Sequence, residues 1–139
     1  MIKVKKLTDY AFILLSYMSK YSENSISAKN LAYRVNIPVS TVIKVLKLLK
    51  NGNFISSKRG LFGGYKILKD PKKISIYEMI GVLEGPISIT DCAIHSNITC
   101  KISMSCPTST YWKKINEAIK RTLEDFKLDQ MASAFKKFY

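Results

Sequence analysis

The sequence has little of the chemistry that enzymes and membrane proteins need. Its 139 residues include one histidine and ten acidic residues, and no phosphate-cradling glycine motif opens a predicted helix. No acid–base pair or activated nucleophile is recognisable, so we expect a protein that is not an enzyme. The longest apolar run, residues 11–15, is far below the roughly 20 residues that cross a bilayer. The basic N-terminus lacks a cleavage site, so we expect a cytoplasmic protein with no membrane partner.

Acidic residues are scarcest in the first half of the chain. Residues 1–73 carry 15 lysines and arginines against three acidic residues, a net charge of +12. Residues 74–139 carry eight basic residues against seven acidic ones, a net charge of +1. A basic surface binds duplex DNA by releasing counterions from the phosphates. The charge alone is equally consistent with a lysine-rich, solvated surface, so the pattern of elements has to discriminate between the two.

Hydrophobic periodicity in residues 1–73 predicts three helices followed by a hairpin. We expect helices over 9–20, capped by Thr8, over 28–35, capped by Ser27, and from residue 38 or 39 to residue 51. Gly52 then suits a left-handed helix end. Two short strands, 54–58 and 65–68, flank a segment that holds three of the six glycines. The predicted fold is mainly α with a small β-hairpin wing, a winged helix-turn-helix.

This fold places particular side chains against DNA. The third helix can enter a major groove about 12 Å wide with its N-terminal residues nearest the bases. We expect Ser40, Thr41 and Lys44 to reach base edges and Lys47 to hold the backbone. Lys58 and Arg59 precede the glycine tip of the wing, and an arginine there suits the negative potential of the minor groove. The glycines are also explained by a tight turn alone, but a turn does not require the basic pair.

The second half of the sequence predicts a connecting region and a long helix. Ser75 and Glu78 form a capping box that opens a helix through residue 83. A long helix follows from residue 108 or 109 to residue 127, with apolar residues every three or four positions, and a short helix covers 129–135. We therefore divide the chain into 1–73, the DNA-binding domain, 74–107, the connecting helix and cysteine loop, and 108–139, a dimerisation helix with its tail. Packing of the long helix within one chain is the alternative.

All three cysteines, Cys92, Cys100 and Cys106, lie within fifteen residues. Their odd number argues against a disulfide framework, and paired Cys-x2-Cys units typical of zinc sites are absent. Three thiolates in one loop suit an iron–sulfur cluster, which normally takes four protein ligands. A zinc site that includes His95, or three reduced cysteines without metal, are the alternatives that the spacing leaves open.

Taken together, these segments resemble the Rrf-two family of bacterial transcription regulators, which includes IscR and NsrR. The matching segments follow in order along nearly the whole chain: 7–11, 37–40, 57–60, 63–65, 74–80, 84–92 and 111–112. Residues 84–87 and 112–119 look most like the branch that regulates the SUF iron–sulfur assembly operon. The resemblance implies a homodimer with a crossing dimerisation helix that binds operator DNA, and a cluster, 2Fe–2S rather than 4Fe–4S, near the subunit interface.

The resemblance also implies a ligand set. Cys92, Cys100 and Cys106 match the three cysteine ligands, whereas Ser109 stands where IscR-like members have a histidine ligand. Asp9 matches the position from which NsrR-like members supply an aspartate across the dimer. Asp9 could equally be a surface or helix-capping carboxylate. The implied function is a repressor that senses iron–sulfur cluster status and controls cluster assembly genes; a nitric-oxide or redox-responsive repressor, or a metal-free thiol-based regulator, is the alternative.

Overall fold

The computed structural model describes residues 3–21, 24–93, 100–102 and 105–137. In these residues the chain order is α1 (Lys6–Tyr21), α2 (Ala28–Val35), α3 (Val39–Asn51), β1 (Ile55–Lys58), β2 (Gly64–Ile67), α4 (Ile76–Glu84), the 3-10 turn η1 (Asp91–Ala93), α5 (Ser109–Asp125), α6 (Leu128–Ser133) and the 3-10 turn η2 (Ala134–Lys137). The mainly helical fold with a two-stranded hairpin is therefore confirmed.

The helix α1 begins earlier than the sequence predicts, and Thr8 does not cap it. Thr8 lies inside the helix and is buried. The free amides at the start of α1 are instead met by a carboxylate from α4, because Lys5 N–H donates to Glu84 Oε1 over 2.7 Å. A hydrogen bond from the Thr8 side chain lowers the pKa of Glu84 most. Burial opposes this effect, and the hydrogen bond from Lys5 N–H adds to the lowering. A residue 79 positions from Lys5 along the chain therefore caps this helix.

The predicted helix-turn-helix is present as α2 and α3. Ser27 caps α2 by accepting a hydrogen bond from Asn30 N–H over 3.2 Å. Asn36 ends α2 in the left-handed conformation with φ 54°, which turns the chain toward α3. The predicted stripe of α3 is fully buried and consists of Val42, Val45, Leu46 and Leu49.

The end of α3 differs from the prediction. Gly52 has φ −80°, so it is not left-handed, and the left-handed residue is Asn53 with φ 58°. Gly52 is needed for a different reason, because a Cβ atom there would lie 2.7 Å from Val82 Cγ1 of α4. The glycine allows α4 to approach the end of α3 closely.

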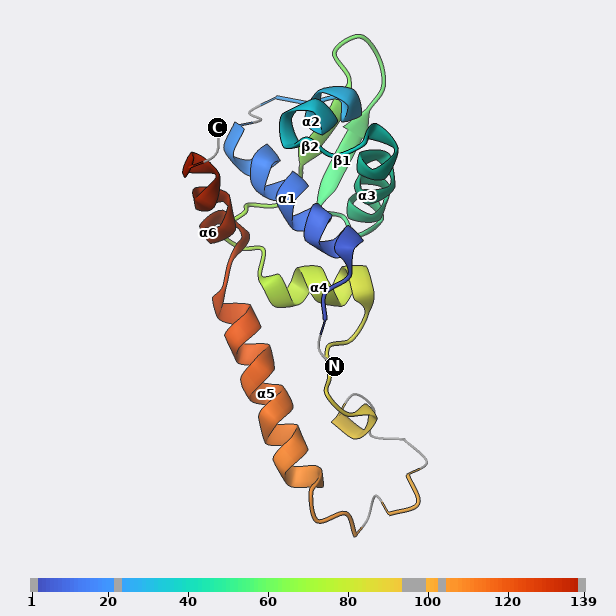
Figure 1. Ribbon diagram of the computed structural model, residues 1–139, viewed down its shortest axis with the longest axis vertical. Coiled ribbons are helices and arrows are strands. Elements are labelled where there is room, and N and C mark those ends of the chain that lie inside the picture. The colour runs from blue at the N-terminus through green and yellow to red at the C-terminus, as the bar shows by residue number, and fades with distance from the viewer. Residues whose placement is uncertain (1–2, 22–23, 94–99, 103–104, 138–139) are drawn as a thin grey trace.

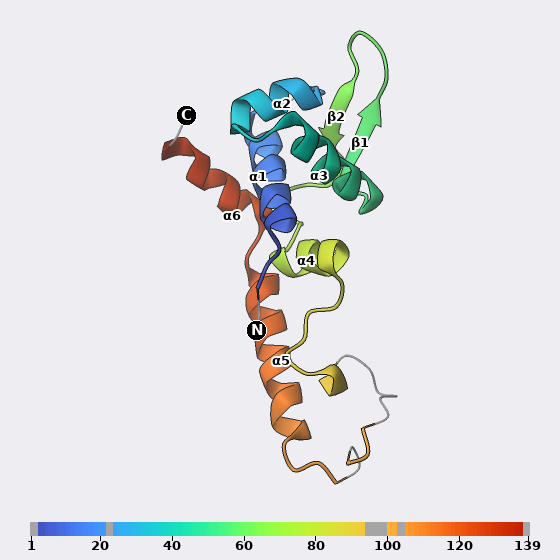
Figure 2. The same ribbon diagram turned by 45° about the vertical axis from the view of Figure 1, so that its right-hand side comes forward.

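The hairpin is antiparallel and is fastened to the helical core at its base. Its register pairs Ile55 with Ile67 and Lys58 with Gly64. The backbone of Tyr65 exchanges two hydrogen bonds with Ile26, of 2.8 and 3.0 Å, so the segment before α2 extends the sheet by one bridge. Ile55 of β1 is buried in the core that includes α3, whereas the hairpin tip projects beyond α2 (Figures 1 and 2).

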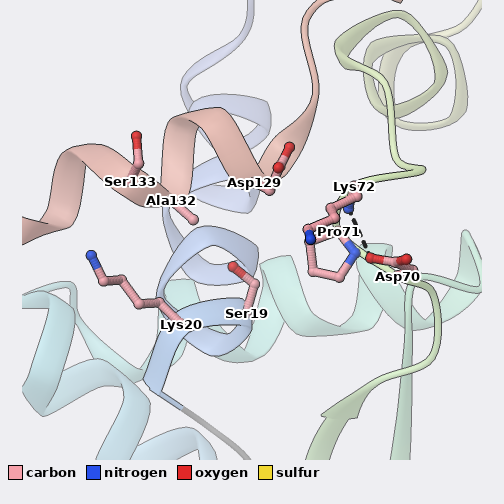
Figure 3. Close-up of a pocket in the computed structure, with 8 residues that line it drawn as sticks. All are labelled: Ser19, Lys20, Asp70, Pro71, Lys72, Asp129, Ala132 and Ser133. Carbon is pink, nitrogen blue, oxygen red and sulfur yellow. Dashed lines mark hydrogen bonds between the residues drawn. The ribbon is translucent and has the colours of Figure 1, made fainter.

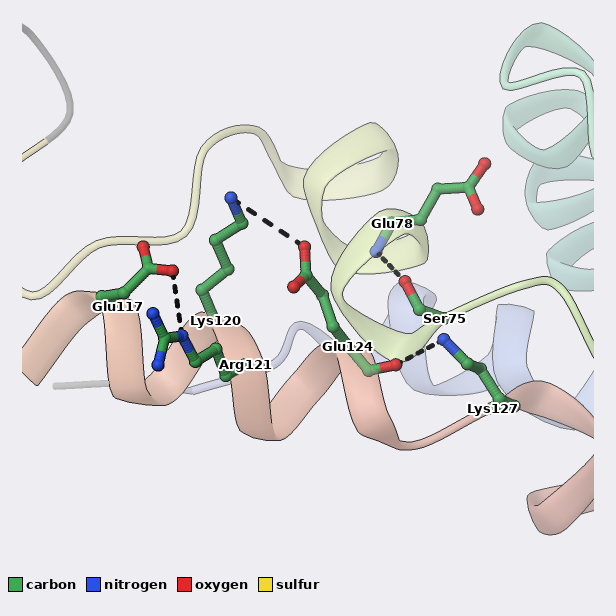
Figure 4. Close-up of polar contacts among 7 residues, drawn as sticks. All are labelled: Ser75, Glu78, Glu117, Lys120, Arg121, Glu124 and Lys127. Atoms are coloured by element: carbon green, nitrogen blue, oxygen red, sulfur yellow. Dashed lines mark hydrogen bonds and ion pairs between the residues drawn. The ribbon is translucent and has the colours of Figure 1, made fainter.

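The predicted capping box of α4 is half present. Ser75 Oγ accepts a hydrogen bond from Glu78 N–H over 3.0 Å, as predicted. Figure 4 shows this contact between Ser75 and the Glu78 backbone. The Glu78 carboxylate does not return to Ser75 and instead pairs with Lys69. The backbone around Ser75 is held by the chain after α5, because Ile76 N–H donates to the Phe126 carbonyl and Leu128 N–H to the Ile74 carbonyl, both over 3.0 Å.

The long helix α5 extends away from the core, on the side opposite the hairpin tip (Figures 1 and 2). None of its residues is buried. Two ion pairs at i, i+4 spacing on its surface, Glu117–Arg121 and Lys120–Glu124, stabilise the helix (Figure 4). The chain then returns to the core, where α6 packs on α1 and buries Leu128 and Ala132. The division at residues 73 and 107 stays a prediction, although α6 joins the core of the first segment.

Candidate DNA interface and cysteine segment

The outward face of α3 presents polar and basic side chains to solvent. Ser40, Lys44 and Lys47 are exposed and Thr41 is half-buried. In the described part of the chain, no acidic residue forms an ion pair with either lysine. Unpaired lysines on an exposed helix keep their full charge available for phosphate oxygens. The structure thus places all four predicted α3 residues on one accessible helix.

The same face includes an apolar residue that the sequence interpretation missed. Ile43 is 49% exposed and lies between Ser40 and Lys44 on the outward side of α3, with Val39 also exposed at the helix start. An exposed isoleucine on a recognition helix can contact the methyl group of thymine in the major groove. The sequence does indicate this residue, because Ile43 is apolar but lies outside the buried stripe, among polar residues of the outward face.

The hairpin contributes the second basic group. Lys58 ends β1, Arg59 follows it, and both are exposed. Neither forms an ion pair within the residues that the structure describes. In Figure 2 the hairpin and α3 lie on the same side of the molecule, while α5 points away from both. One face of the chain can therefore meet a major groove through α3 and an adjacent minor groove through the hairpin.

The described segments on either side of the cysteines, η1 and the start of α5, lie at the end of α5 that is away from this face (Figure 1), and all three cysteines are free thiols. Cys92 is half-buried in η1, where its Sγ lies 3.3 Å from Thr90 Oγ1. Cys100 is exposed, and Cys106 is half-buried just before α5. Among the described residues, no three histidines, cysteines or carboxylates are already placed to hold one metal ion.

Asn116 joins the segment before η1 to α5. Its Oδ1 accepts hydrogen bonds from Ile89 N–H over 2.8 Å and from Ser88 Oγ over 3.2 Å. Its Nδ2 donates to the Trp112 carbonyl of the preceding turn over 2.8 Å, which fixes the orientation of the amide. This residue was missed by the sequence interpretation because an asparagine on a helix surface carries no local signal of a distant partner.

The pKa of the Cys106 thiol is lowered from its ordinary value by its neighbours. Its Sγ lies 3.4 Å from Thr108 Oγ1, and hydrogen bonds from the Thr108 hydroxyl and then its backbone N–H lower the pKa of Cys106. Burial of the sulfur opposes this effect only partly. A lowered thiol pKa raises both nucleophilicity at neutral pH and affinity for a metal, because the thiolate is the reactive and ligating form.

The candidates for a fourth ligand differ in whether their side chains are free to bind a metal. Asp9 is exposed in the first turn of α1. Ser109 is engaged at the start of α5, where its hydroxyl donates to the Cys106 carbonyl over 3.1 Å. His95 lies outside the described residues.

An apolar face along α5 is only partly covered. Of the predicted seam, Ile115 and Phe126 are exposed, and Trp112, Ile119 and Leu123 are half-buried. Helix α4 and η1 contact α5, but no residue of α5 is fully buried. A seam that one chain leaves partly in solvent is typical of a helix that packs against another subunit.

A cavity of about 380 Å³ lies between the end of α1, the turn at residues 70–72 and α6. Lys20 Nζ and Asp129 Oδ1 line it, and neither has a hydrogen-bond partner among the described residues. Figure 3 shows the Lys20 ammonium and the Asp129 carboxylate on opposite sides of the cavity. Because these polar groups do not converge, the cavity provides no defined ligand position.

Within the described residues, none of the helices combines the length and the apolar composition that a membrane crossing requires.

Comparison with known proteins agrees with this arrangement. The profile of the Rrf2 family, described as an iron-dependent transcriptional regulator, matches residues 4–134. The HTH-type transcriptional regulator CymR of Bacillus subtilis is 28% identical over 121 residues, which cover 87% of this chain and 82% of CymR. The regulator NsrR of Halalkalibacterium halodurans is 25% identical over 131 residues, which cover 94% of this chain and 90% of NsrR.

Solved structures show the same fold. The structure of CymR (YrzC), the global cysteine regulator of B. subtilis, superposes with a TM-score of 0.70 at 27% identity and covers 96% of this chain and 98% of that one. T. potens IscR superposes with a TM-score of 0.69 at 21% identity, over 99% and 92% of the two chains. Because the family match spans residues 4–134, the chain belongs to the Rrf2 family of transcriptional regulators, which are not enzymes.

Proposed function

We propose that this regulator is a homodimeric repressor that binds duplex operator DNA and reports iron–sulfur cluster status through Cys92, Cys100 and Cys106. The observation that carries the proposal is that basic side chains and free thiols lie in separate parts of the same chain. Exposed, unpaired basic side chains lie on α3 and the hairpin, and three free thiols lie from η1 to the start of α5. The proposal assigns DNA binding to the first set and sensing to the second.

The DNA contacts follow from the face described above. Ser40, Thr41 and Lys44 contact base edges, Lys47 contacts the phosphate backbone, and Lys58 and Arg59 contact the minor groove and its phosphates. The charge distribution supports this assignment, because the half of the chain that holds all six residues has a net charge of +12.

Cysteine thiols are the ligand type that iron–sulfur clusters use. All three are free, none is fully buried, and the pKa of Cys106 is lowered toward the ligating thiolate form. They are not already assembled, so ligation has to draw the segments around η1 and the start of α5 together. A 2Fe–2S cluster bound there would supply a redox-sensitive and labile group.

The fourth ligand in this proposal is Asp9 of the partner subunit. The Ser109 hydroxyl is already engaged at the start of α5, whereas the Asp9 carboxylate is exposed. A carboxylate oxygen binds iron less tightly than a thiolate does, so a site completed by Asp9 would lose its cluster readily. That lability suits a sensor better than a structural site.

The partly covered seam of α5 is the proposed dimer interface. Its apolar side chains would be buried against the same face of a second copy, as expected for a two-fold symmetric dimer. The segment that carries Cys92 is tied to α5 by Asn116, so a change in that segment can reach the dimer interface. A shift of α5 would then alter the spacing of the two recognition helices on the operator.

The proposed targets are iron–sulfur cluster assembly genes, which rests on the likeness of residues 84–87 and 112–119 to the SUF-regulating branch. A second candidate is a metal-free thiol regulator. It is favoured by one observation, the lowered pKa of the Cys106 thiol, which would make this cysteine reactive toward oxidants without iron.

Anaerobic purification tests the sensing role. We expect coloured protein with visible charge-transfer absorption and stoichiometric iron and sulfide in the wild type, loss of both in Cys92→Ser, and a less stable cluster in Asp9→Ala. Asp125→Ala, an exposed carboxylate at the end of α5, is the matched control and should behave as wild type. Colourless, iron-free protein after reconstitution would contradict the cluster proposal and favour the thiol regulator.

DNA binding is tested with a duplex selected by the wild-type protein from a random-sequence pool. Lys44→Ala and Arg59→Ala should weaken binding, and the salt slope should fall by about 0.9 for each phosphate contact removed. Lys114→Ala removes an exposed lysine from α5 and should leave binding unchanged. Equal binding by all three variants would show that α3 and the hairpin are not the DNA interface.

A further inference from the structure

The hairpin tip carries the two most exposed large apolar side chains in the described part of the chain. Leu61 is 95% exposed and Phe62 is 90% exposed. They are adjacent, with Gly60 before them and Gly63 after them. Neither side chain stabilises the fold, because both are almost fully in water. An exposed apolar pair at the end of a projection points to an intermolecular contact.

The tip is held in place by its backbone. Gly63 N–H donates to the Gly60 carbonyl over 3.0 Å, and Gly60 has φ 112°, a conformation that side chains rarely allow. A Cβ atom on Gly63 would lie 2.2 Å from the Lys58 carbonyl oxygen, so only glycine fits there. The hydrogen bonds between Tyr65 and Ile26 fasten the base of the hairpin. The apolar pair is therefore presented on a preorganised turn.

The surroundings of the pair are basic and polar. A groove of about 690 Å³ separates the tip from the start of α2, and its walls include Lys58, Lys66, Asn24 and Asn30. Residues 54–69 contain no acidic residue, and three cationic side chains without an ion pair among the described residues lie on the strands and turn beside the tip: Lys58, Arg59 and Lys66. This combination offers cations to a phosphate backbone on the flanks and an apolar surface at the centre.

We infer that Leu61 and Phe62 form a wedge that enters the minor groove of the operator, partly unstacks one base step and bends the duplex. The inference rests on the proposed DNA binding and adds a mode of contact to it. Apolar side chains inserted between base steps open the minor groove and kink DNA toward the major groove. Lys58 and Lys66 would then hold the phosphates beside the opened step. Flexible pyrimidine–purine steps are the preferred position, because they unstack at the lowest cost.

Duplex DNA fits this tip better than the other partners of an apolar surface do. The tip lies on the same side of the molecule as α3, so a duplex in contact with α3 passes the hairpin (Figure 2). The flanking charge is of one sign and complements phosphate. Two apolar side chains are also too few for the core of a stable protein–protein interface.

The test compares the double variant Leu61→Ala/Phe62→Ala with two matched controls. Leu68→Ala removes an exposed apolar side chain at the base of the hairpin, and Arg59→Ala removes a charge beside the tip. The probe is the duplex selected by the wild-type protein, with a fluorophore at each end to report bending and 2-aminopurine at pyrimidine–purine steps to report unstacking. Binding is measured by anisotropy over a series of salt concentrations.

We expect the double variant to bind roughly tenfold or more weakly, because burial of two apolar side chains is lost. Its salt slope should equal that of the wild type, since an apolar contact releases no counterions. End-to-end bending and 2-aminopurine fluorescence should both decrease. Arg59→Ala should instead change the salt slope, and Leu68→Ala should change nothing. All variants should keep the wild-type melting temperature, because the replaced side chains are exposed.

Wild-type affinity and bending in the double variant would overturn the inference while leaving the proposed function in place. The same holds if the double variant keeps its DNA affinity but loses binding to vesicles of phosphatidylglycerol and phosphatidylcholine, which would assign the tip to a membrane surface. Absence of sequence-selective DNA binding by the wild type would instead refute the proposed function itself.

Discussion

Replacing Asn116 with alanine should release residues 88–90 from α5 without unfolding the core. The change removes the hydrogen bonds that Asn116 Oδ1 accepts from Ile89 N–H, of 2.8 Å, and from Ser88 Oγ, of 3.2 Å. A net contribution of about 1 kcal/mol for each neutral hydrogen bond gives a loss of about 1–2 kcal/mol in local stability. Since 1.4 kcal/mol corresponds to a factor of ten, the Ile89 amide should exchange roughly 5–30 times faster.

Hydrogen exchange followed at residue resolution measures this directly. The Ile89 amide should lose protection in Asn116→Ala, whereas core amides of α3 should exchange as in the wild type. Glu117→Gln is the matched control, because it breaks an exposed ion pair with Arg121 on the same helix and does not touch residues 88–90. Unchanged exchange at Ile89 in Asn116→Ala, or an equal change in the control, would refute the reasoning.

Three further predictions concern packing and thiol chemistry. Gly52→Ala should destabilise the fold by about 1–3 kcal/mol through overpacking against α4, whereas Gly81→Ala, with open space around its new Cβ atom, should be neutral or stabilising in denaturant unfolding. Leu128→Ala should cost about 2–5 kcal/mol in the same assay, because this fully buried side chain joins α6 to the core. Thr108→Val should raise the pKa of Cys106 by removing the hydroxyl donor, so iodoacetamide alkylation of this cysteine in iron-free protein should slow at neutral pH.

Each of these predictions has a result that contradicts it. Equal stabilities of the two glycine variants would mean that the close approach of α3 and α4 is not limiting. A loss below 1 kcal/mol in Leu128→Ala would show that α6 is not part of the core. An alkylation profile of Cys106 that is the same with threonine or valine at position 108 would remove the hydroxyl as the cause of the lowered pKa.

Local patterns in the sequence predicted the helices and the hairpin of residues 1–73 well. Period and composition predicted α2 and α3 with their buried stripe, because these helices bury one continuous face and carry local end signals such as Ser27. The glycine-rich hairpin was likewise predictable, since a tight turn needs residues that allow positive φ. The exposed positions of Ser40, Lys44 and Arg59 followed from the same pattern.

The predictions that failed concern ends of helices that distant residues control. Thr8 is of a residue type that commonly caps helices, yet Glu84 of α4 caps α1 because the fold brings its carboxylate to Lys5 N–H. Glu78 completes a capping-box pattern, but Lys69 is near enough to take its carboxylate. In both places a tertiary partner competes successfully with the local one, and single-chain periodicity carries no information about that partner.

The sequence by itself determined the fold class, the basic half and the concentration of three cysteines in one segment, since composition, period and spacing are local properties. Only the tertiary structure decided that the segment before η1 is tied to α5 through Asn116, that α6 returns to α1, and that the seam of α5 is not fully buried within one chain. It also decided that Leu61 and Phe62 stand free at the hairpin tip. Those features depend on which surfaces meet in space, and burial is set by residues far apart along the chain.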